Sequence, residues 1–200
     1  AGLPGTTVIA SAHGSVEAIR SAFHSAIFRV YTSTDVIGVE FGGALKNVIA
    51  IAAGIVDALD AGDNAKAAVV TRGLAEISRV GVAAGADPLT FQGLAGVGDL
   101  VATAYSPLSR NSRLGRLIGG GMPIDEALAT IGETVEGVST TNAVLRLASG
   151  LNVDLPIASA LQAILREDVA PQEAVAELLG RVPKSEISMS ATPQARVDER

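Results

Sequence analysis

Cysteine is absent from the sequence, and histidine occurs only twice. The chain therefore has no disulfide bond, no thiolate metal site and no cysteine nucleophile. The two histidines, His13 and His24, do not form a ligand cluster, so we expect no metal. The chemistry of this protein has to come from other side chains.

Charge is sparse as well. Only 18% of the residues are charged, the formal net charge is −6, and no cluster of lysine and arginine indicates nucleic-acid binding. Apolar residues make up 48% of the 200 residues, which is enough for a buried core in one or two domains. The first residues lack the basic and then apolar pattern of a signal peptide, so the cytoplasm is the expected compartment.

The most apolar stretch runs from Phe41 to Val56 and contains a single charged residue, Lys46. Such a stretch predicts a helix packed on several sides, and at ~1.5 Å per residue it is too short to span a membrane comfortably. A lone lysine is costly to bury. Lys46 therefore either reaches the surface, or makes a structural ion pair, or has a function.

The N-terminal pattern predicts a strand–helix–strand unit. Thr6–Ala10 and Phe28–Thr32 have strand patterns, and Ser15–Ser25 has helical spacing with Ser15 as its N-cap. Together they have the size of one βαβ unit, but two strands do not form a stable sheet alone. We therefore expect that the chain opens inside a domain, which ends near Ser33-Thr34.

After Asp35 the pattern is mainly α. Asp63–Ala84 has one apolar face and an Arg72–Glu76 pair at i, i+4 spacing. Gly85 is expected to end this helix, and Asp87-Pro88 to begin a short one.

Five more helices are predicted toward the C-terminus. They are Ser109–Ile118, Ile124–Ile131, Val138–Ser149, Pro156–Arg166 and Pro171–Leu179. Their expected start signals are Ser109 and Asp154, and their expected stop signals are Gly150 and Gly180. From Pro183 onward the sequence is polar and aperiodic, so we expect a poorly ordered tail.

Three short segments are candidates for chemistry. Gly96-Val97-Gly98-Asp99-Leu100 predicts a tight turn into a helix, in which Asp99 is either the N-cap or a functional carboxylate. This segment is not a dinucleotide fingerprint, because it lacks the preceding strand and the third glycine.

The second segment, Ser109-Arg110-Asn111, lies at a predicted helix start, where free N–H groups and a guanidinium suit a phosphate or carboxylate. The alternative is an ordinary capped surface helix with a solvated Arg110. The third segment, Glu133-Thr134-Val135-Glu136-Gly137, places two acids before a helix, which any helix start favours.

The combination of segments is more specific than its parts. The strings V-I-G-V-E-F-G-G-A-L-K-N-V-I-A-I-A-A-G, T-R-G-L-A-E, G-V-G-D-L-V-A-T, S-P-L-S-R-N-S-R-L-G and T-V-E-G-V occur in this order. They closely resemble the bacterial NAD(P)-dependent glycerol-3-phosphate dehydrogenases, from about Gly2 to Glu186. The resemblance implies the end of a Rossmann domain (residues 1–33), an all-α 6-phosphogluconate-dehydrogenase-like domain (residues 34–186) and a polar tail (residues 187–200).

The resemblance also implies an activity and a site. Enzymes of this family interconvert dihydroxyacetone phosphate and sn-glycerol 3-phosphate with NAD or NADP, for glycerophospholipid synthesis. By resemblance Lys46 is the catalytic acid/base and also touches substrate. The other implied substrate-binding residues are Asp99, Thr103, Ser109, Arg110 and Asn111, and the implied cofactor contacts are Arg110, Thr134 and Glu136. Thr134 departs from the valine that similar sequences often carry.

The resemblance further implies a homodimer that acts on a small molecule, with a glycine-rich fingerprint expected upstream of Ala1. Two other interpretations remain open on the residues alone. One is the helical domain of a dehydrogenase for another hydroxy acid or keto acid, which would not need the Ser109-Arg110-Asn111 anion site. The other is a non-catalytic helical dimerisation module, favoured by the many small residues of the apolar helix.

Overall fold

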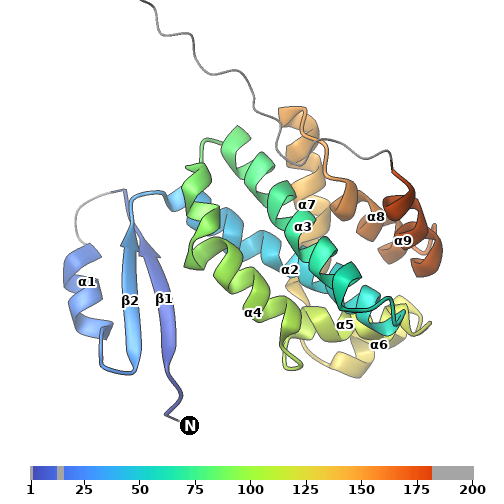
Figure 1. Ribbon diagram of the computed structural model, residues 1–200, viewed down its shortest axis with the longest axis horizontal. Helices are drawn as coiled ribbons and strands as arrows, with labels where there is room; N and C mark the ends of the chain where they lie inside the picture. Colours follow the sequence, from blue (N-terminus) through green and yellow to red (C-terminus); the bar gives the residue numbers. More distant parts are fainter. Residues whose placement is uncertain (1, 13–15, 182–200) are drawn as a thin grey trace, which may run out of the picture.

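The computed structural model describes residues 2–12 and 16–181 (Figure 1). In chain order the elements are β1 (Gly5–Ala10), α1 (Val16–Phe23), β2 (Phe28–Ser33), α2 (Val36–Ala58), α3 (Asp63–Ala83), the 3₁₀-helix η1 (Pro88–Gln92), the π-helical segment η2 (Leu94–Gly98), α4 (Asp99–Tyr105), α5 (Arg110–Gly119), α6 (Ile124–Ile131), α7 (Glu136–Leu151), α8 (Pro156–Leu165) and α9 (Pro171–Gly180). The predicted strand–helix–strand unit followed by a helical domain is confirmed.

The strand–helix–strand unit lies at one end of the molecule (Figure 1). β1 and β2 pair in parallel, with Gly5 opposite Phe28 and Ala10 opposite Ser33, and α1 makes the crossover between them. No residue of α1 is buried, and Phe23 is 63% exposed. The predicted N-cap, Ser15, lies outside the described residues. In the described chain Ile19 and Phe23 of α1 are therefore exposed, whereas Val30 of β2 is buried.

The central element of the helical domain is α2, which packs against α3, α4, α5, α7 and α8. Asp35 caps its start by accepting a hydrogen bond from the backbone N–H of Gly38, 2.8 Å away. The helix is longer than predicted, with 23 residues, and by length and composition it could cross a membrane. Half of its most apolar window is buried inside the protein, as in a core helix.

Small residues allow α2 and α5 to cross closely. A Cβ on Gly54 of α2 would lie 2.2 Å from the carbonyl oxygen of Ser112, and one on Gly115 of α5 would lie 2.0 Å from that of Ile51. Any side chain at either position would push the two backbones apart. This crossing fixes the start of α5 relative to α2, and both helices carry predicted site residues.

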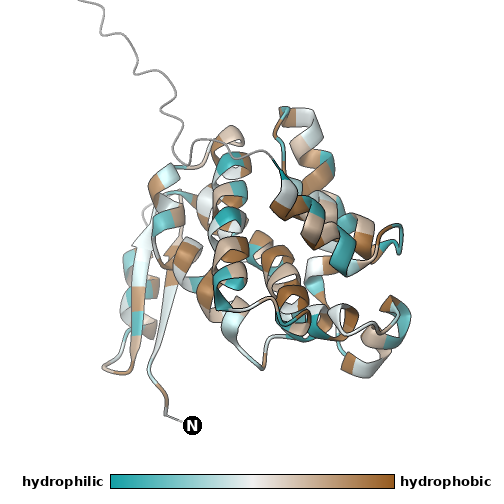
Figure 2. Cartoon of the chain, turned by 45° about the vertical axis from the view of Figure 1, so that its right-hand side comes forward, coloured by the Kyte–Doolittle hydropathy of each residue, from teal (hydrophilic) through white to brown (hydrophobic). Residues whose placement is uncertain are grey.

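Figure 2 shows hydrophilic and hydrophobic residues on the same helices, as expected of helices that bury one face and expose the other.

The predicted ion pair between Arg72 and Glu76, at i, i+4 spacing, is wrong. Val70 and Ile77 of α3 are buried as predicted, but Glu76 is also buried, with 5% of its surface exposed. Its carboxylate accepts hydrogen bonds from the backbone N–H groups of Ile157 (2.7 Å) and Ala158 (3.3 Å) at the start of α8. The helical spacing was satisfied, but this face of α3 packs inward.

Several predicted helix ends also need correction. Gly96 and Gly98 are not in a tight turn but in the π-helical η2, which runs directly into α4. α7 does not stop before Gly150 but continues to Leu151, with Asn152 as a left-handed C-cap. The N-cap of α8 is Leu155 and not Asp154.

The remaining helix ends agree with the prediction except at α9. Gly180 is the last residue of α9 instead of its stop signal. The predicted caps Asp87 and Ser109 are confirmed, and Gly85 follows α3 with a positive φ of 102°. The predicted tail, from Pro183 onward, lies entirely outside the described residues.

Candidate active site

Lys46 and Asp99 meet between α2 and α4. The Nζ atom of Lys46 lies 2.5 Å from Oδ2 of Asp99, and the side chains are 23% and 38% exposed. The hydroxyl of Thr103, one turn further along α4, donates to Oδ1 of Asp99 at 3.4 Å. Asp99 is therefore not the N-cap of α4: that position is Gly98, and the carboxylate instead holds the lysine. A partly accessible ammonium held in this way can donate a proton to a bound molecule.

A second polar network joins α2, α5 and α7. The side-chain oxygen of Asn47 accepts from the amide of Asn111 at 2.9 Å, and the amide of Asn47 donates to Glu136 at 3.3 Å. The side-chain oxygen of Asn111 accepts from the backbone N–H of Gly137 at 2.9 Å. A Cβ on Gly137 would lie 2.7 Å from that oxygen, so only glycine allows this approach. The start of α7 is thereby fixed against Asn47 and Asn111.

Asn47 is a site residue that the sequence analysis did not select. It is 6% exposed and follows Lys46 directly in the chain. The signal was available, because Asn47 is the one uncharged polar residue in the apolar stretch around Lys46. A buried amide needs partners, and Asn47 finds them in Asn111 and Glu136.

The start of α5 has the features of an anion site. Ser109 is the N-cap, and its hydroxyl accepts from the N–H of Ser112 at 3.3 Å. Within the described residues this leaves the N–H groups of Arg110 and Asn111 in the first turn available to an anion. Arg110 is 41% exposed and contacts Glu133 at 3.4 Å, a weak pair that a stronger anion can replace.

The predicted cofactor contacts lie at the same edge. Arg110 begins α5, Glu136 begins α7, and Thr134 is exposed in the loop just before α7. Thr134 adjoins Glu133, the partner of Arg110. The structure therefore brings all the predicted residues to one region, although only Lys46, Asp99 and Thr103 among them contact one another directly.

A partly buried charged network lies next to this region. Asp57, near the end of α2, accepts from Lys66 at 2.8 Å and from Arg116 at 3.5 Å. Arg116 also donates to the hydroxyl of Ser112 at 2.8 Å, and that hydroxyl donates to the carbonyl of Ala104 at 3.3 Å. The first turn of α5 is thus tied to both α2 and α4. In the parts of the chain that the structure describes, no three His, Asp or Glu side chains are grouped so that they could hold a metal.

The helical domain is similar to the C-terminal domain of NAD-dependent dehydrogenases. The solved structure of glycerol-3-phosphate dehydrogenase from Coxiella burnetii superimposes with a TM-score of 0.87 at 42% identity, over 90% of this chain and 56% of that one. The family described as NAD-dependent glycerol-3-phosphate dehydrogenase C-terminus matches residues 35–176. The chain belongs to this family.

Curated relatives agree with this assignment. A glycerol-3-phosphate dehydrogenase (NAD(P)+) from Chlorobium phaeobacteroides is 50% identical over 184 residues, 91% of this chain and 55% of the relative. One from Thermoanaerobacter is 52% identical over 186 residues, 92% of this chain and 56% of the relative. The chain thus spans about half the length of the curated relatives it matches.

Proposed function

We propose that the chain is the substrate-side catalytic domain of an NAD(P)-dependent glycerol-3-phosphate dehydrogenase, which reduces dihydroxyacetone phosphate to sn-glycerol 3-phosphate. The observation that carries this proposal is the Lys46–Asp99 pair, at 2.5 Å, in the same region as the helix start at Ser109. The names of the curated relatives support the choice of substrate.

In this proposal Lys46 is the proton donor. Nicotinamide supplies hydride chemistry when it is bound. As negative charge develops on the carbonyl oxygen of the substrate, the ammonium of Lys46 stabilises it and transfers a proton, which leaves a neutral amine and an alcohol. Asp99, itself contacted by Thr103, keeps the Nζ atom in place. The neutral amine regains its proton from water.

The phosphate group is assigned to the start of α5. The free N–H groups of its first turn, the positive end of the helix dipole and the fork of Arg110 all favour an anion there. Asn111 is buried and held by Asn47 and Gly137, so it positions this turn.

The chain supplies residues that suit contacts with part of a dinucleotide cofactor. Arg110, Thr134 and Glu136 lie at one accessible edge and are the proposed contacts. Nothing in the 200 residues supplies the G-x-G-x-x-G turn that holds a pyrophosphate. The domain limits at residues 33 and 186, the homodimer and the cytoplasmic location stay predictions.

The test is an assay of the full-length gene product that carries this sequence. Oxidation of NADH and of NADPH is followed in separate reactions with dihydroxyacetone phosphate, and with unphosphorylated dihydroxyacetone as the control. We expect turnover that requires the phosphorylated ketone. A folded product that oxidises neither cofactor with this ketone, or that prefers the unphosphorylated one, contradicts the proposal.

A further inference from the structure

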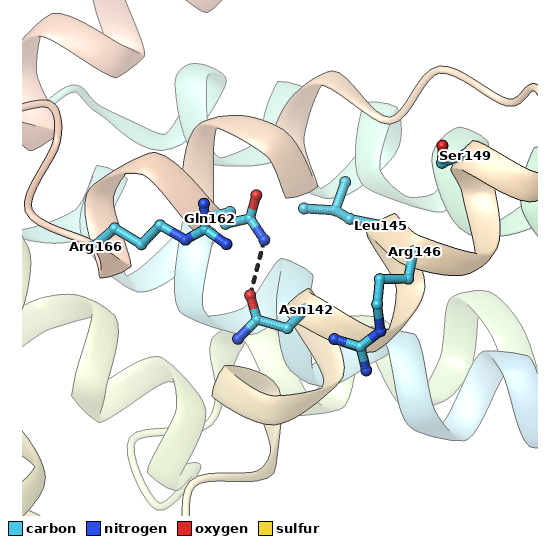
Figure 3. Close-up of a pocket in the computed structure, with 6 residues that line it drawn as sticks. All are labelled: Asn142, Leu145, Arg146, Ser149, Gln162 and Arg166. Carbon is cyan, nitrogen blue, oxygen red and sulfur yellow. Dashed lines mark hydrogen bonds between the residues drawn. The ribbon is translucent and has the colours of Figure 1, made fainter.

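A groove of about 580 Å³ lies between α7 and α8 (Figure 3). Its lining residues are Asn142, Leu145, Arg146 and Ser149 of α7, and Gln162 and Arg166 at the end of α8. The four residues of α7 have the spacing i, i+3, i+4, i+7, so they form one face of that helix. The volume is in the range of small-molecule sites.

The charge of the groove is entirely positive. It is lined by two arginines and no acid, in a chain whose formal net charge is −6. Arg116 and Arg181 have carboxylate partners, Asp57 and Asp154. In the described part of the chain, neither Arg146 nor Arg166 has such a partner. Two guanidinium groups without acidic partners in one groove favour an anion there.

The uncharged lining residues add donors. Gln162 donates to the side-chain oxygen of Asn142 at 2.7 Å, and Figure 3 shows these two amides pointing toward each other from α8 and α7. With that oxygen occupied, Asn142 presents its N–H₂ group, and Ser149 adds a hydroxyl. Leu145 supplies an apolar wall. A ligand for this lining needs several acceptor oxygens and negative charge.

We propose that the α7–α8 groove binds a small phosphorylated anion, held by Arg146 and Arg166. A phosphate group offers three acceptor oxygens and nearly two negative charges, and guanidinium groups bind it in a bidentate manner. This site is separate from the proposed substrate site. Its residues lie on later turns of α7 than Glu136 and Gly137, and none of them contacts Lys46 or Arg110 in the structure.

The experiment is an NMR titration of the 200-residue chain, labelled with ¹⁵N. Inorganic phosphate, pyrophosphate and, for comparison, citrate are added in separate titrations at constant ionic strength. The Arg110→Gln variant serves as the background, because it weakens the other anion site. The signals followed are the side-chain amides of Asn142 and Gln162. We expect saturable shifts, and at least tenfold weaker binding in Arg146→Gln and in Arg166→Gln.

Arg72→Gln is the matched control, because Arg72 is an exposed arginine on α3 with no ion pair among the described residues. It changes net charge by the same amount, and we expect it to leave binding unchanged. Four results overturn the proposal: shifts that never saturate, equal weakening in Arg72→Gln, no shift in the groove residues, or tighter binding of citrate than of either phosphate.

Discussion

Lys46, the one charged residue in the central part of α2, lies 2.5 Å from Asp99 in the first turn of α4. The two residues are 53 positions apart in the sequence. The contact explains how a lysine is tolerated in an apolar helix, and it leaves the ammonium partly accessible. The pair can therefore be structural, catalytic or both, and substitution separates these roles.

Removing the charge of Lys46 tests its role as proton donor. In the full-length gene product, Lys46→Ala is expected to lower kcat by roughly 10²–10⁴-fold, the usual contribution of a positioned general acid. Lys46→Met keeps most of the side-chain volume and should be equally inactive. Its stability should change little, because Asp99 is 38% exposed and water can solvate it.

Lys66→Met is the control for this prediction. Lys66 is also a helical lysine with a carboxylate partner, Asp57 at 2.8 Å, but it contacts none of the proposed substrate-binding residues. We expect Lys66→Met to lower stability in urea unfolding and to leave kcat within about twofold of the unmodified enzyme. Near-normal kcat in a folded Lys46 variant would refute the assignment of the proton donor.

Arg110 is predicted to bind the phosphate in a bidentate manner, through two N–H groups of its guanidinium. Arg110→Lys keeps the charge but loses the bidentate geometry, so KM for dihydroxyacetone phosphate should rise roughly tenfold. KM for unphosphorylated dihydroxyacetone should not change. Arg113→Lys, one turn along the same helix and without an ion pair in the described chain, should change neither value. An equal rise for both substrates in Arg110→Lys would mean that Arg110 does not contact the phosphate.

Glu76 makes stability depend on pH. Burial raises the pKa of its carboxyl to about 7, although the hydrogen bonds from Ile157 and Ala158 act in the opposite direction. Between the ordinary value of 4.5 and about 7 the folded chain therefore binds more protons at this site than the unfolded chain does. The stabilising contribution is complete below pH 4.5 and is lost as pH rises through about 7.

The measurement is urea unfolding of the unmodified chain and of Glu76→Gln between pH 5 and 8. The shift is equivalent to about 3 kcal/mol, so the unmodified chain should lose up to that amount relative to the variant as pH rises. Glu173→Gln, which alters an exposed acid in the first turn of α9, should retain the pH dependence of the unmodified chain. Parallel curves for the unmodified chain and Glu76→Gln would contradict this account.

The sequence predicted the helices better than their contacts. An almost unbroken apolar stretch located α2, and helical spacing located α3, because apolar spacing reflects burial of one helix face. Ser109 was a correct start signal for α5. Glu76 shows that helical spacing alone does not predict which contacts a side chain makes. An acid four residues after Arg72 has the spacing of a surface pair, and only the packing of α8, 81 positions away, buries it.

The site was predicted only in part, because its contacts also join helices that are far apart in the sequence. Lys46 was visible as a charge in an apolar helix, but spacing alone could not bring Asp99 to it. Asp99 was equally consistent with an N-cap, because a carboxylate at a helix start favours both roles. Asn47 was an interior amide whose partners, Asn111 and Glu136, belong to other helices. Long-range polar contacts of this kind leave no local pattern.

Ser112 is predicted to hold the first turn of α5 in place. Its hydroxyl is fully buried, accepts from Arg116 at 2.8 Å and donates to the carbonyl of Ala104 at 3.3 Å. Ser112→Ala removes both contacts and leaves the partly buried guanidinium of Arg116 and the buried carbonyl of Ala104 short of partners. The free energy of unfolding should therefore fall by about 1–3 kcal/mol, measured by urea unfolding.

Ser139→Ala is the matched control for Ser112→Ala. Ser139 is also a helical serine whose hydroxyl donates to a backbone carbonyl, that of Glu136 at 3.1 Å, but it is exposed, so water can replace the lost contact. Its substitution should cost less than about 0.5 kcal/mol.

Because Ser112 lies two residues after Arg110, Ser112→Ala should also raise KM for dihydroxyacetone phosphate more than it lowers kcat. Equal and small effects of the two substitutions would show that the hydroxyl of Ser112 does not fix the start of α5.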